Sequence, residues 1–499
     1  MRTTLRRLWF LGVLLMPLGA RAQAPVAETD AVRAALERSP RARAAHFDGR
    51  AADAAMRIAI GERAPSLTVS GSGGHTETLA AAMGGTLVRS QQDSIGVDSA
   101  VHLVTDVGTE IDLGLSSSVG WRAANLNPAS PMINTIGPLY ATTLTLDLRQ
   151  PLFRGAGADA TLAAIREATA DARGAHLSAR QSISELVRDV LVAHRELAYA
   201  LDALDVSDQA VALAAEQAAQ SRAREALGTV AHIESLRYAS ALATAESTRR
   251  SARATLETSA LALAVLLGLS PEEAGTLHVA HADPTAATPA STEALAARAI
   301  LSSPELAALA ADIDTARELE RASADADQVQ LDLVGQLAGG VTYSSDTLRT
   351  LSLPDGRPAM SATVGIELTM PLGPAADRAR HEQASAQLEA TTARYETRER
   401  EIVSEVATQR TTWLSANERA VLFADALAAA SQLARAEREA LQLGTATGIE
   451  VVQAQQDERT AALQALRAVA DRREAEIALA HLTGTLLDAF HVRVDDEAE

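Results

Sequence analysis

The strongest constraint on the fold is a pair of long segments in which an apolar residue recurs at every seventh position. The first, from Asp159 to Leu227, contains no proline and only one glycine, Gly174. Its heptad residues are Ile183, Val190, Leu197, Leu204 and Val211, and those of the second segment are Val406, Trp413, Ala420, Leu427, Ala434 and Leu441. A helix of about 68 residues is about 100 Å long. A continuous apolar stripe of that length predicts partner helices packed along it, as in a coiled coil.

The chain also repeats itself. Residues 31–71 align without a gap with residues 295–335, which places Ser39-Pro40 on Ser303-Pro304. A later block places Leu227-Gly228-Thr229 on Leu443-Gly444-Thr445. Matching residues of the two copies are separated by 216 to 264 positions, which is too long for one unit of a solenoid. We therefore predict two halves, at 23–268 and 292–484, which are joined by a connector at 269–291 and followed by a frayed acidic tail at 485–499.

Each half is predicted to contain a helix, a pair of strands, a very long helix and a returning helix. The fold class is therefore mainly α with a small β part. The first helix is predicted over 29–63, with Thr29 or Asp30 as its cap. Strands are predicted near 64–75, 139–151, 328–343 and 361–371, long helices at 157–227 and 374–443, and returning helices at 231–268 and 447–484. Gly228 and Gly444 mark the tight turns between the long and returning helices.

The predicted strands alternate between polar and apolar residues. In Thr143–Arg149, one face carries only Leu and the other carries Thr, Asp and Arg. A single strand of this kind fits a sandwich with one wet face. Four such strands favour a membrane barrel with Leu toward lipid and polar residues toward a watery lumen. Aromatic residues lie near the strand ends, as such a barrel requires: Trp121, Tyr140, Phe153 and Tyr343. The lumen-facing residues are then Thr145, Asp147, Arg149, Asp332 and Glu367. For residues 72–140 the sequence leaves two alternatives open, additional strands or an extracellular extension.

Residues 1–22 are typical of a secretory signal peptide. Arg2, Arg6 and Arg7 precede an apolar run, and Ala20-Arg21-Ala22 provides a cleavage site of small residues. The apolar run is too short to cross a bilayer, which needs about 20 residues. No later stretch reaches that length, so insertion in a membrane would have to use strands.

Several chemistries are excluded by composition. All 45 basic residues are Arg, so neither a P-loop nor a Schiff-base lysine is possible, and the absence of Cys removes thiolate chemistry. A net charge of -19 and a pI near 5.1 argue against a nucleic-acid surface. No catalytic motif is present, so we expect no enzyme and no cofactor. His278 and His281 in the connector raise the question of a metal pair, but without a carboxylate cluster they are better interpreted as surface residues.

Taken together, these features resemble the TolC-like outer-membrane efflux proteins over nearly the whole mature chain. The residues that carry the resemblance are the two Ser-Pro helix motifs, the strand exit Gln150–Gly155, and the two Leu-Gly-Thr turns, each followed by Ile-Glu. The resemblance implies a homotrimer in outer-membrane lipid, with a 12-stranded β-barrel on a 12-helix periplasmic α-barrel. It also implies an exit duct of a tripartite efflux or type I secretion system, with a periplasmic adaptor and an inner-membrane pump as partners. A periplasmic helical scaffold or adaptor that never enters a membrane remains the alternative.

The resemblance also assigns roles to residues near the turns. The hairpin tips Leu227-Gly228-Thr229 and Leu443-Gly444-Thr445 are predicted to dock the adaptor. Glu234 and Glu450 follow the tips at matching positions and are predicted to line the constriction at the periplasmic end. The alternative for each Glu is a helix N-terminal acid favoured by the helix dipole. The substrate, whether drug, metal or protein, stays open.

Overall fold

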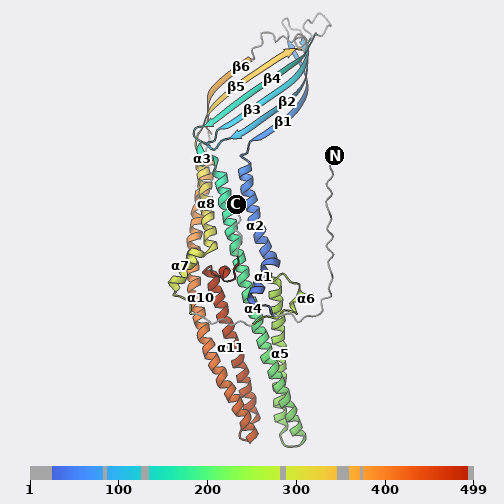
Figure 1. Cartoon of the computed structure of the whole chain (residues 1–499), viewed down its shortest axis with the longest axis vertical. Helices are drawn as coiled ribbons and strands as arrows, with labels where there is room; N and C mark the ends of the chain where they lie inside the picture. The colour runs from blue at the N-terminus through green and yellow to red at the C-terminus, as the bar shows by residue number, and fades with distance from the viewer. Residues whose placement is uncertain are drawn as a thin grey trace, which may run out of the picture. The chain divides into compact units, whose positions relative to one another are not determined.

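The structure is a computed structural model that describes residues 25–81, 87–124, 134–280, 288–344, 359–370 and 375–492. It contains long helices and one six-stranded antiparallel sheet (Figure 1). The principal helices are α1 (Glu28–Arg38), α2 (Pro40–Gly61), α3 (Gly157–Thr161), α4 (Ala163–Ala226), α5 (His232–Leu266), α7 (Thr292–Ser302), α8 (Pro304–Ala326), α10 (Ala375–Leu443) and α11 (Gly448–Leu482). The strands are β1 (Ser66–Ala81), β2 (Leu87–Val104), β3 (Glu110–Ala124), β4 (Asn134–Pro151), β5 (Gln330–Ser344) and β6 (Ala359–Thr369).

The helix boundaries repeat with the offsets found in the sequence. An offset of 264 carries the bounds of α1 onto those of α7, and the start of α2 onto the start of α8. An offset of 216 carries both bounds of α5 onto those of α11. These helices of the two halves therefore share one plan, as the duplication predicts.

The first predicted helix is divided in two in both halves. Ser39 and Ser303 have extended backbone, and Pro40 and Pro304 begin the next helix. Proline is well suited to a first helical position, because its fixed φ is helical and its missing N–H would have no partner there. The predicted cap was wrong as well: α1 starts at Glu28, with Ala27 as an N-cap that makes no side-chain bond.

The long helices occupy the predicted segments, apart from a break at Leu162 between α3 and α4. Every predicted heptad residue is buried or half-buried, and Val190, Leu197 and Val406 are completely enclosed. The stripe therefore faces other parts of the protein, as its period predicts. Gly228 and Gly444 have left-handed backbone, with φ of 71° and 76°, and end the two long helices as predicted.

The sheet differs from the prediction in its number of strands. The four predicted strands are present as β1, β4, β5 and β6, but β2 and β3 lie between β1 and β4, so the strand order follows the chain from β1 to β6 (Figure 1). The segment 72–140, which the sequence left open, thus contributes to the sheet. The expected twelve-stranded barrel assumed four strands in each of three chains. Because each chain has six strands in its sheet, that number no longer follows.

The chain divides into two compact units. The first comprises residues 1–44, 182–303 and 402–499, and the second comprises residues 45–181 and 304–401. The largest core of the first unit is built from α1, α4, α5 and α11 around Leu191, Leu197 and Leu263. Leu486 and Leu487 join this core, so the tail is not frayed at these residues; positions 493–499 lie outside the described residues.

The connector is also partly ordered. A short helix, α6 (Pro271–Ala274), begins with a capping box in which Ser270 and Glu273 bond each other's backbone. Val279 then pairs with Val26 in an isolated bridge. The predicted signal peptide lies outside the described residues. Among the residues that are described, no single helix passes the length and hydropathy test for a membrane span, although the bent pair α7 and α8 passes it together.

Candidate functional site

One face of the sheet is polar across all six strands. A row of paired positions crosses the sheet through Ser66, His102, Asp112, Asp147, Gln336 and Thr363. Within the row, His102 Nδ1 lies 2.7 Å from Asp112 Oδ1, and Gln336 Nε2 donates to Asp147 Oδ1 at 2.7 Å. The five predicted lumen residues, Thr145, Asp147, Arg149, Asp332 and Glu367, all lie on this face by the strand register.

Arg149 and Asp332 form the strongest polar contact on this face. Arg149 donates from Nε to Asp332 Oδ2 at 2.8 Å and a second time from Nη2, while Glu367 lies 3.9 Å from the same guanidinium. Asp332 is only 1% exposed and also accepts from Gln330 at 2.9 Å. A surface groove beside the pair is lined by further acids, Glu110 and Asp112. These two acids were missed by sequence reasoning, because they belong to β3, in the segment where the sequence left strands and an extracellular extension as alternatives.

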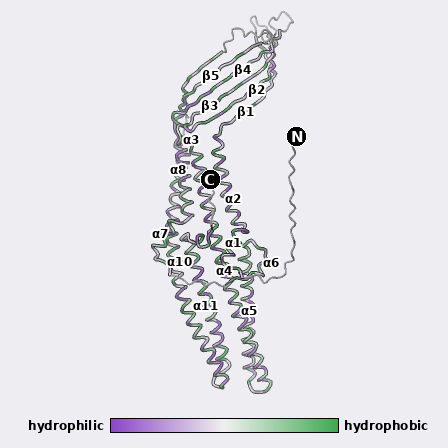
Figure 2. The backbone as a smooth tube through the Cα atoms, in the orientation of Figure 1, coloured by the Kyte–Doolittle hydropathy of each residue, from purple (hydrophilic) through white to green (hydrophobic). Residues whose placement is uncertain are grey.

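The opposite face of the sheet is apolar and exposed. The row next to the polar one runs through Leu67, Val101, Leu113, Leu146, Leu337 and Ala362. Hydrophobic and hydrophilic residues accordingly alternate along the strands (Figure 2). Leu67, Leu144 and Val364 are 67%, 51% and 78% exposed. A contiguous apolar surface of this kind marks contact with lipid or another protein.

The helical hairpins end in two similar turns. At the first tip, the backbone N–H and the hydroxyl of Thr229 both donate to the carbonyl of Arg224; at the second, Thr445 does the same to Ala440. These bonds satisfy the last helix carbonyls, which would otherwise lack partners. Leu227 and Leu443 are about four-fifths exposed, at 79% and 80%, so each tip presents an apolar side chain.

The two predicted gate acids differ in their surroundings. Glu450 closes a capping box: its Oε2 accepts from the N–H of Thr447 at 2.7 Å and from its hydroxyl at 2.9 Å. These donors hold the pKa of Glu450 below its usual value, because they stabilise the charged form. Glu234 makes no such cap, and α5 starts after Ala231 without a side-chain bond.

A contact between the two hairpins was not predicted. A Cβ added at Gly448, the first residue of α11, would collide with the hydroxyl of Tyr238 and lie 2.9 Å from Oε1 of Glu234. Tyr238 and Gly448 are both buried. The duplication does not signal this contact, because the residue of the first hairpin equivalent to Gly448 is His232, which has a large side chain.

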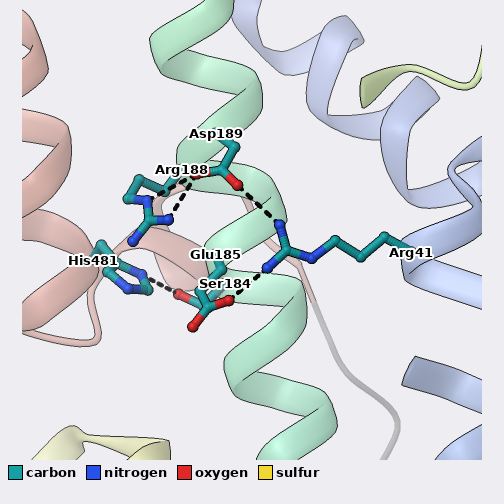
Figure 3. A network of polar contacts seen from close by, with 6 residues as sticks. All are labelled: Arg41, Ser184, Glu185, Arg188, Asp189 and His481. Atoms are coloured by element: carbon teal, nitrogen blue, oxygen red, sulfur yellow. Dashed lines mark hydrogen bonds and ion pairs between the residues drawn. The ribbon is translucent and has the colours of Figure 1, made fainter. Parts of the chain in front are cut away.

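A polar network joins α4 to α2 and α11 in the first unit (Figure 3). Arg41 binds Glu185 at 2.5 Å and Asp189 at 2.9 Å, and Arg188 also binds Asp189. His481 Nδ1 lies 2.8 Å from the hydroxyl of Ser184. Burial, and to a lesser extent the charge of Arg188, lowers the pKa of His481 to about 4, against the opposing charges of Glu185, Asp189 and Glu405.

This buried histidine predicts a pH-dependent contribution to the stability of the first unit. Because the folded pKa is below the ordinary value of 6.5, the unfolded chain binds more protons between pH 6.5 and 4. His481 should therefore lower the free energy of unfolding as the pH falls through that window, by up to about 3 kcal/mol, with no effect above it. Burial raises the pKa of Glu474, in the same unit, to about 7, so Glu474 raises the free energy of unfolding by a similar amount as the pH falls from 7 to 4.5.

The measurement is urea unfolding, followed by far-UV circular dichroism, from pH 4 to pH 8. In the wild type the two contributions largely cancel, so we expect His481→Gln to become more stable as the pH falls from 7 to 4.5, as Glu474 alone predicts. His46→Gln, which changes an exposed histidine, should keep the wild-type profile. An unchanged profile in His481→Gln would show that His481 does not titrate in this window.

The described residues contain no group of three or more His, Cys, Asp or Glu placed to hold a metal ion. His278 is exposed and its Nδ1 lies 2.9 Å from the carbonyl of Thr276, while His281 lies outside the described residues. The candidate site is therefore the two-faced sheet together with the hairpin tips.

Comparison with known proteins agrees with this architecture. Residues 295–485 match the family described as outer membrane efflux protein. No curated protein sequence matches the chain. The fold is similar to that of the outer membrane protein VceC from Vibrio cholerae, with a TM-score of 0.67 and 16% identity over 92% of this chain and 96% of that one.

Two further structures are similar to the same extent. The outer-membrane channel OprN gives a TM-score of 0.69 at 17% identity, covering 92% of this chain and 90% of its own. The Campylobacter jejuni CmeC outer membrane channel gives 0.65 at 13% identity, covering 92% and 85%. At such identities the structures establish the fold. With the family match, they confirm the resemblance to TolC-like outer-membrane efflux proteins.

Proposed function

We propose that this chain, whose residues 295–485 match the outer membrane efflux protein family, is an outer-membrane channel through which substrates leave the cell envelope. The observation that carries the proposal is the sheet, which has one polar face and one exposed apolar face across six strands. A barrel wall needs both faces, because one contacts lipid and the other contacts water.

The assembled channel is a homotrimer with two parts. The sheets of three chains close around a watery lumen, since the apolar face must meet lipid and the sheet edges must find partners. Helices α4, α5, α10 and α11 of three chains supply the twelve helices of a periplasmic tunnel. Substrates reach the tunnel from an inner-membrane pump through a periplasmic adaptor. The pump supplies the transport energy, in keeping with a chain that contains no Lys for a P-loop.

Fractionation tests the function directly. We expect the mature protein in the detergent-insoluble outer-membrane fraction as a trimer. Deleting its gene should then raise the retention of substrates of the cognate pump. The opposing hypothesis, a periplasmic scaffold or adaptor, predicts a soluble periplasmic species. That result would overturn the channel, because an exposed apolar sheet face would then have to be covered by protein.

The hairpin tips are the proposed contacts for the adaptor. Leu227 and Leu443 are exposed apolar side chains, and the left-handed glycines beside them permit the tight reversal. We expect Thr229→Trp combined with Thr445→Trp to reduce transport and crosslinking to the adaptor, while the trimer still assembles. Thr229→Ser and Thr445→Ser, which keep the hydroxyl bonds, form the control. Full coupling in the Trp variant would exclude docking at the tips.

Glu234 and Glu450 are the proposed constriction acids. Threefold symmetry gives three copies of each, and a ring of carboxylates near the axis attracts cations and repels anions. Converting both to Gln should lower the cation selectivity of the channel and its block by trivalent cations in planar bilayers. Because Glu450 is held by Thr447, we expect Glu234→Gln alone to have the larger effect. Unchanged selectivity and block in the double variant would remove the ring from the mechanism.

A further inference from the structure

We infer that the hairpin β2–β3 crosses the membrane beside the other four strands, so that each chain supplies six strands and the trimer closes an eighteen-stranded barrel. The inference rests on the proposed function, because it needs a barrel. In the alternative arrangement, this hairpin lies outside the membrane and extends the extracellular loop that follows β1.

The turn of the hairpin lies at the end of the sheet where the chain connects to the helices. Arg63, just after α2, donates to the carbonyl of Thr105 at 2.9 Å and lies 3.3 Å from Asp106. On the other side of the turn, the N–H of Gly157, the first residue of α3, donates to the carbonyl of Val107 at 3.1 Å. The hairpin therefore reaches the full height of the sheet, whereas an extracellular extension would stop short of this end.

The pairing of the hairpin with its neighbours is continuous. β1 and β2 pair from Ser66↔His102 to Ala81↔Leu87, and β3 pairs with β4 from Glu110↔Arg149 to Ala124↔Asn134, with a single irregularity near Trp121. β1 and β4 are each bonded to the hairpin and not to one another. Removing the hairpin from the barrel wall would therefore leave both strands with an unpaired edge.

The hairpin carries the same two-faced pattern as the predicted strands. On the apolar face, β2 presents Ile95, Val97, Ser99, Val101 and Leu103, and β3 presents Ile111, Leu113, Leu115, Ser117 and Val119. These two sets of residues, the apolar bands of β2 and β3, are paired along their whole length, from Leu103↔Ile111 to Ile95↔Val119. Each spans nine residues, and a tilted strand needs about 9–11 residues to cross a bilayer.

The limits of the bands agree with a bilayer boundary. Beyond Ile95 and Val119, the same face carries the pair Asp93↔Trp121, and Asp93 lies 2.6 Å from His75 of β1. Aromatic residues flank the apolar band of a membrane barrel at its interfaces, which is where Trp121 lies relative to these bands. Val97 and Leu115, inside the bands, are 53% and 45% exposed in the single chain. Lipid is the occupant that suits a belt of this height.

Closure by copies of the chain preserves the strand pattern. β1 leads away from the helices and β6 returns to them, so β6 of one copy lies antiparallel to β1 of the next. Barrel diameter grows roughly in proportion to strand number, so eighteen strands give a lumen about half as wide again as twelve. The hairpin also adds to the lumen wall, where Ser116 donates to Asp98 at 2.6 Å.

Single cysteines test the inference cleanly, because the chain contains none of its own. Three pairs of sites compare the two faces at similar depth: Val97 with Ala100 on β2, Leu115 with Ser118 on β3, and Leu144 with Thr145 on β4 as the reference. Each variant trimer is labelled with bimane and reconstituted in phosphatidylcholine vesicles that contain a nitroxide-labelled acyl chain. Accessibility is measured separately with a charged, water-soluble maleimide.

We expect the nitroxide to quench bimane several-fold more strongly at Val97, Leu115 and Leu144 than at their partner sites. The maleimide should react faster at Ala100, Ser118 and Thr145. If the β4 pair alternates while both faces of β2 and β3 meet only water, the hairpin is extracellular and this inference is wrong, but the channel stands. If the β4 pair shows no lipid contact either, the proposed channel itself fails and the inference fails with it.

Discussion

Replacing both Gly268 and Gly484 with alanine should lower the free energy of unfolding of the helical unit by about 4–8 kcal/mol. Both residues follow the returning helices and have left-handed backbone, with φ of 68° and 67°. An alanine in this conformation costs about 1 kcal/mol at each site. A Cβ at Gly268 would also lie 2.8 Å from the carbonyl oxygen of Arg38, and one at Gly484 would lie 2.8 Å from Cβ of Ser302. Overpacking of this kind costs about 1–3 kcal/mol at each site.

The tip glycines provide a matched control. Gly228 and Gly444 have the same left-handed backbone, but a Cβ at either position would meet nothing within 4 Å. Gly228→Ala with Gly444→Ala should therefore cost only about 2 kcal/mol in total, the backbone contribution alone. Urea unfolding followed by circular dichroism measures both pairs. Equal losses in the two double variants would mean that the contacts with Arg38 and Ser302 contribute nothing.

The helical part of the fold was largely predictable because its signals are local. A period of seven over many turns identifies a buried stripe, and a glycine at its end identifies the turn, so α4, α5, α10 and α11 were found within a few residues. Each Ser-Pro pair is a local signal for a helix boundary, because proline disfavours helical backbone in the residue before it, but the first helix was predicted to continue through Pro40. The cap at Thr29 or Asp30 was mistaken because a plausible cap residue inside a helix looks the same as one at its start.

The sequence left the added hairpin undecided between a pair of strands and an extracellular extension, because its strand pattern is weak. Ser99 and Ser117 interrupt the apolar face, and Gly96, Gly114 and Gly120 weaken the strand pattern. Only the register, which sets Val101 beside Leu67 and Leu113, reveals a common apolar row. For the same reason, alternation placed Arg149 and Asp332 on one face but did not predict that they bind each other.

Removing the guanidinium of Arg149, the partner of Asp332, should have the second large effect on stability. Arg149→Leu leaves the carboxylate of Asp332, which is 1% exposed, with Gln330 as its remaining described donor. Breaking a buried ion pair by removing one partner costs about 3–5 kcal/mol, because the other charge stays buried without compensation. We expect about 3 kcal/mol, the low end of this range, since the side chain of Arg149 is 38% exposed. The temperature at which the assembled trimer loses its heat-resistant gel mobility measures the loss.

A double variant separates the cost of the orphaned charge from the value of the pair. Arg149→Leu with Asp332→Leu removes both charges, and replacing a whole ion pair with apolar residues is often neutral. The double variant should therefore recover most of the lost stability. Gln336→Leu, which removes an exposed bond to Asp147 on the same face, should cost less than about 1 kcal/mol. If the double variant is no more stable than Arg149→Leu, the guanidinium acts through packing against its neighbours, because relieving the buried carboxylate would then have made no difference.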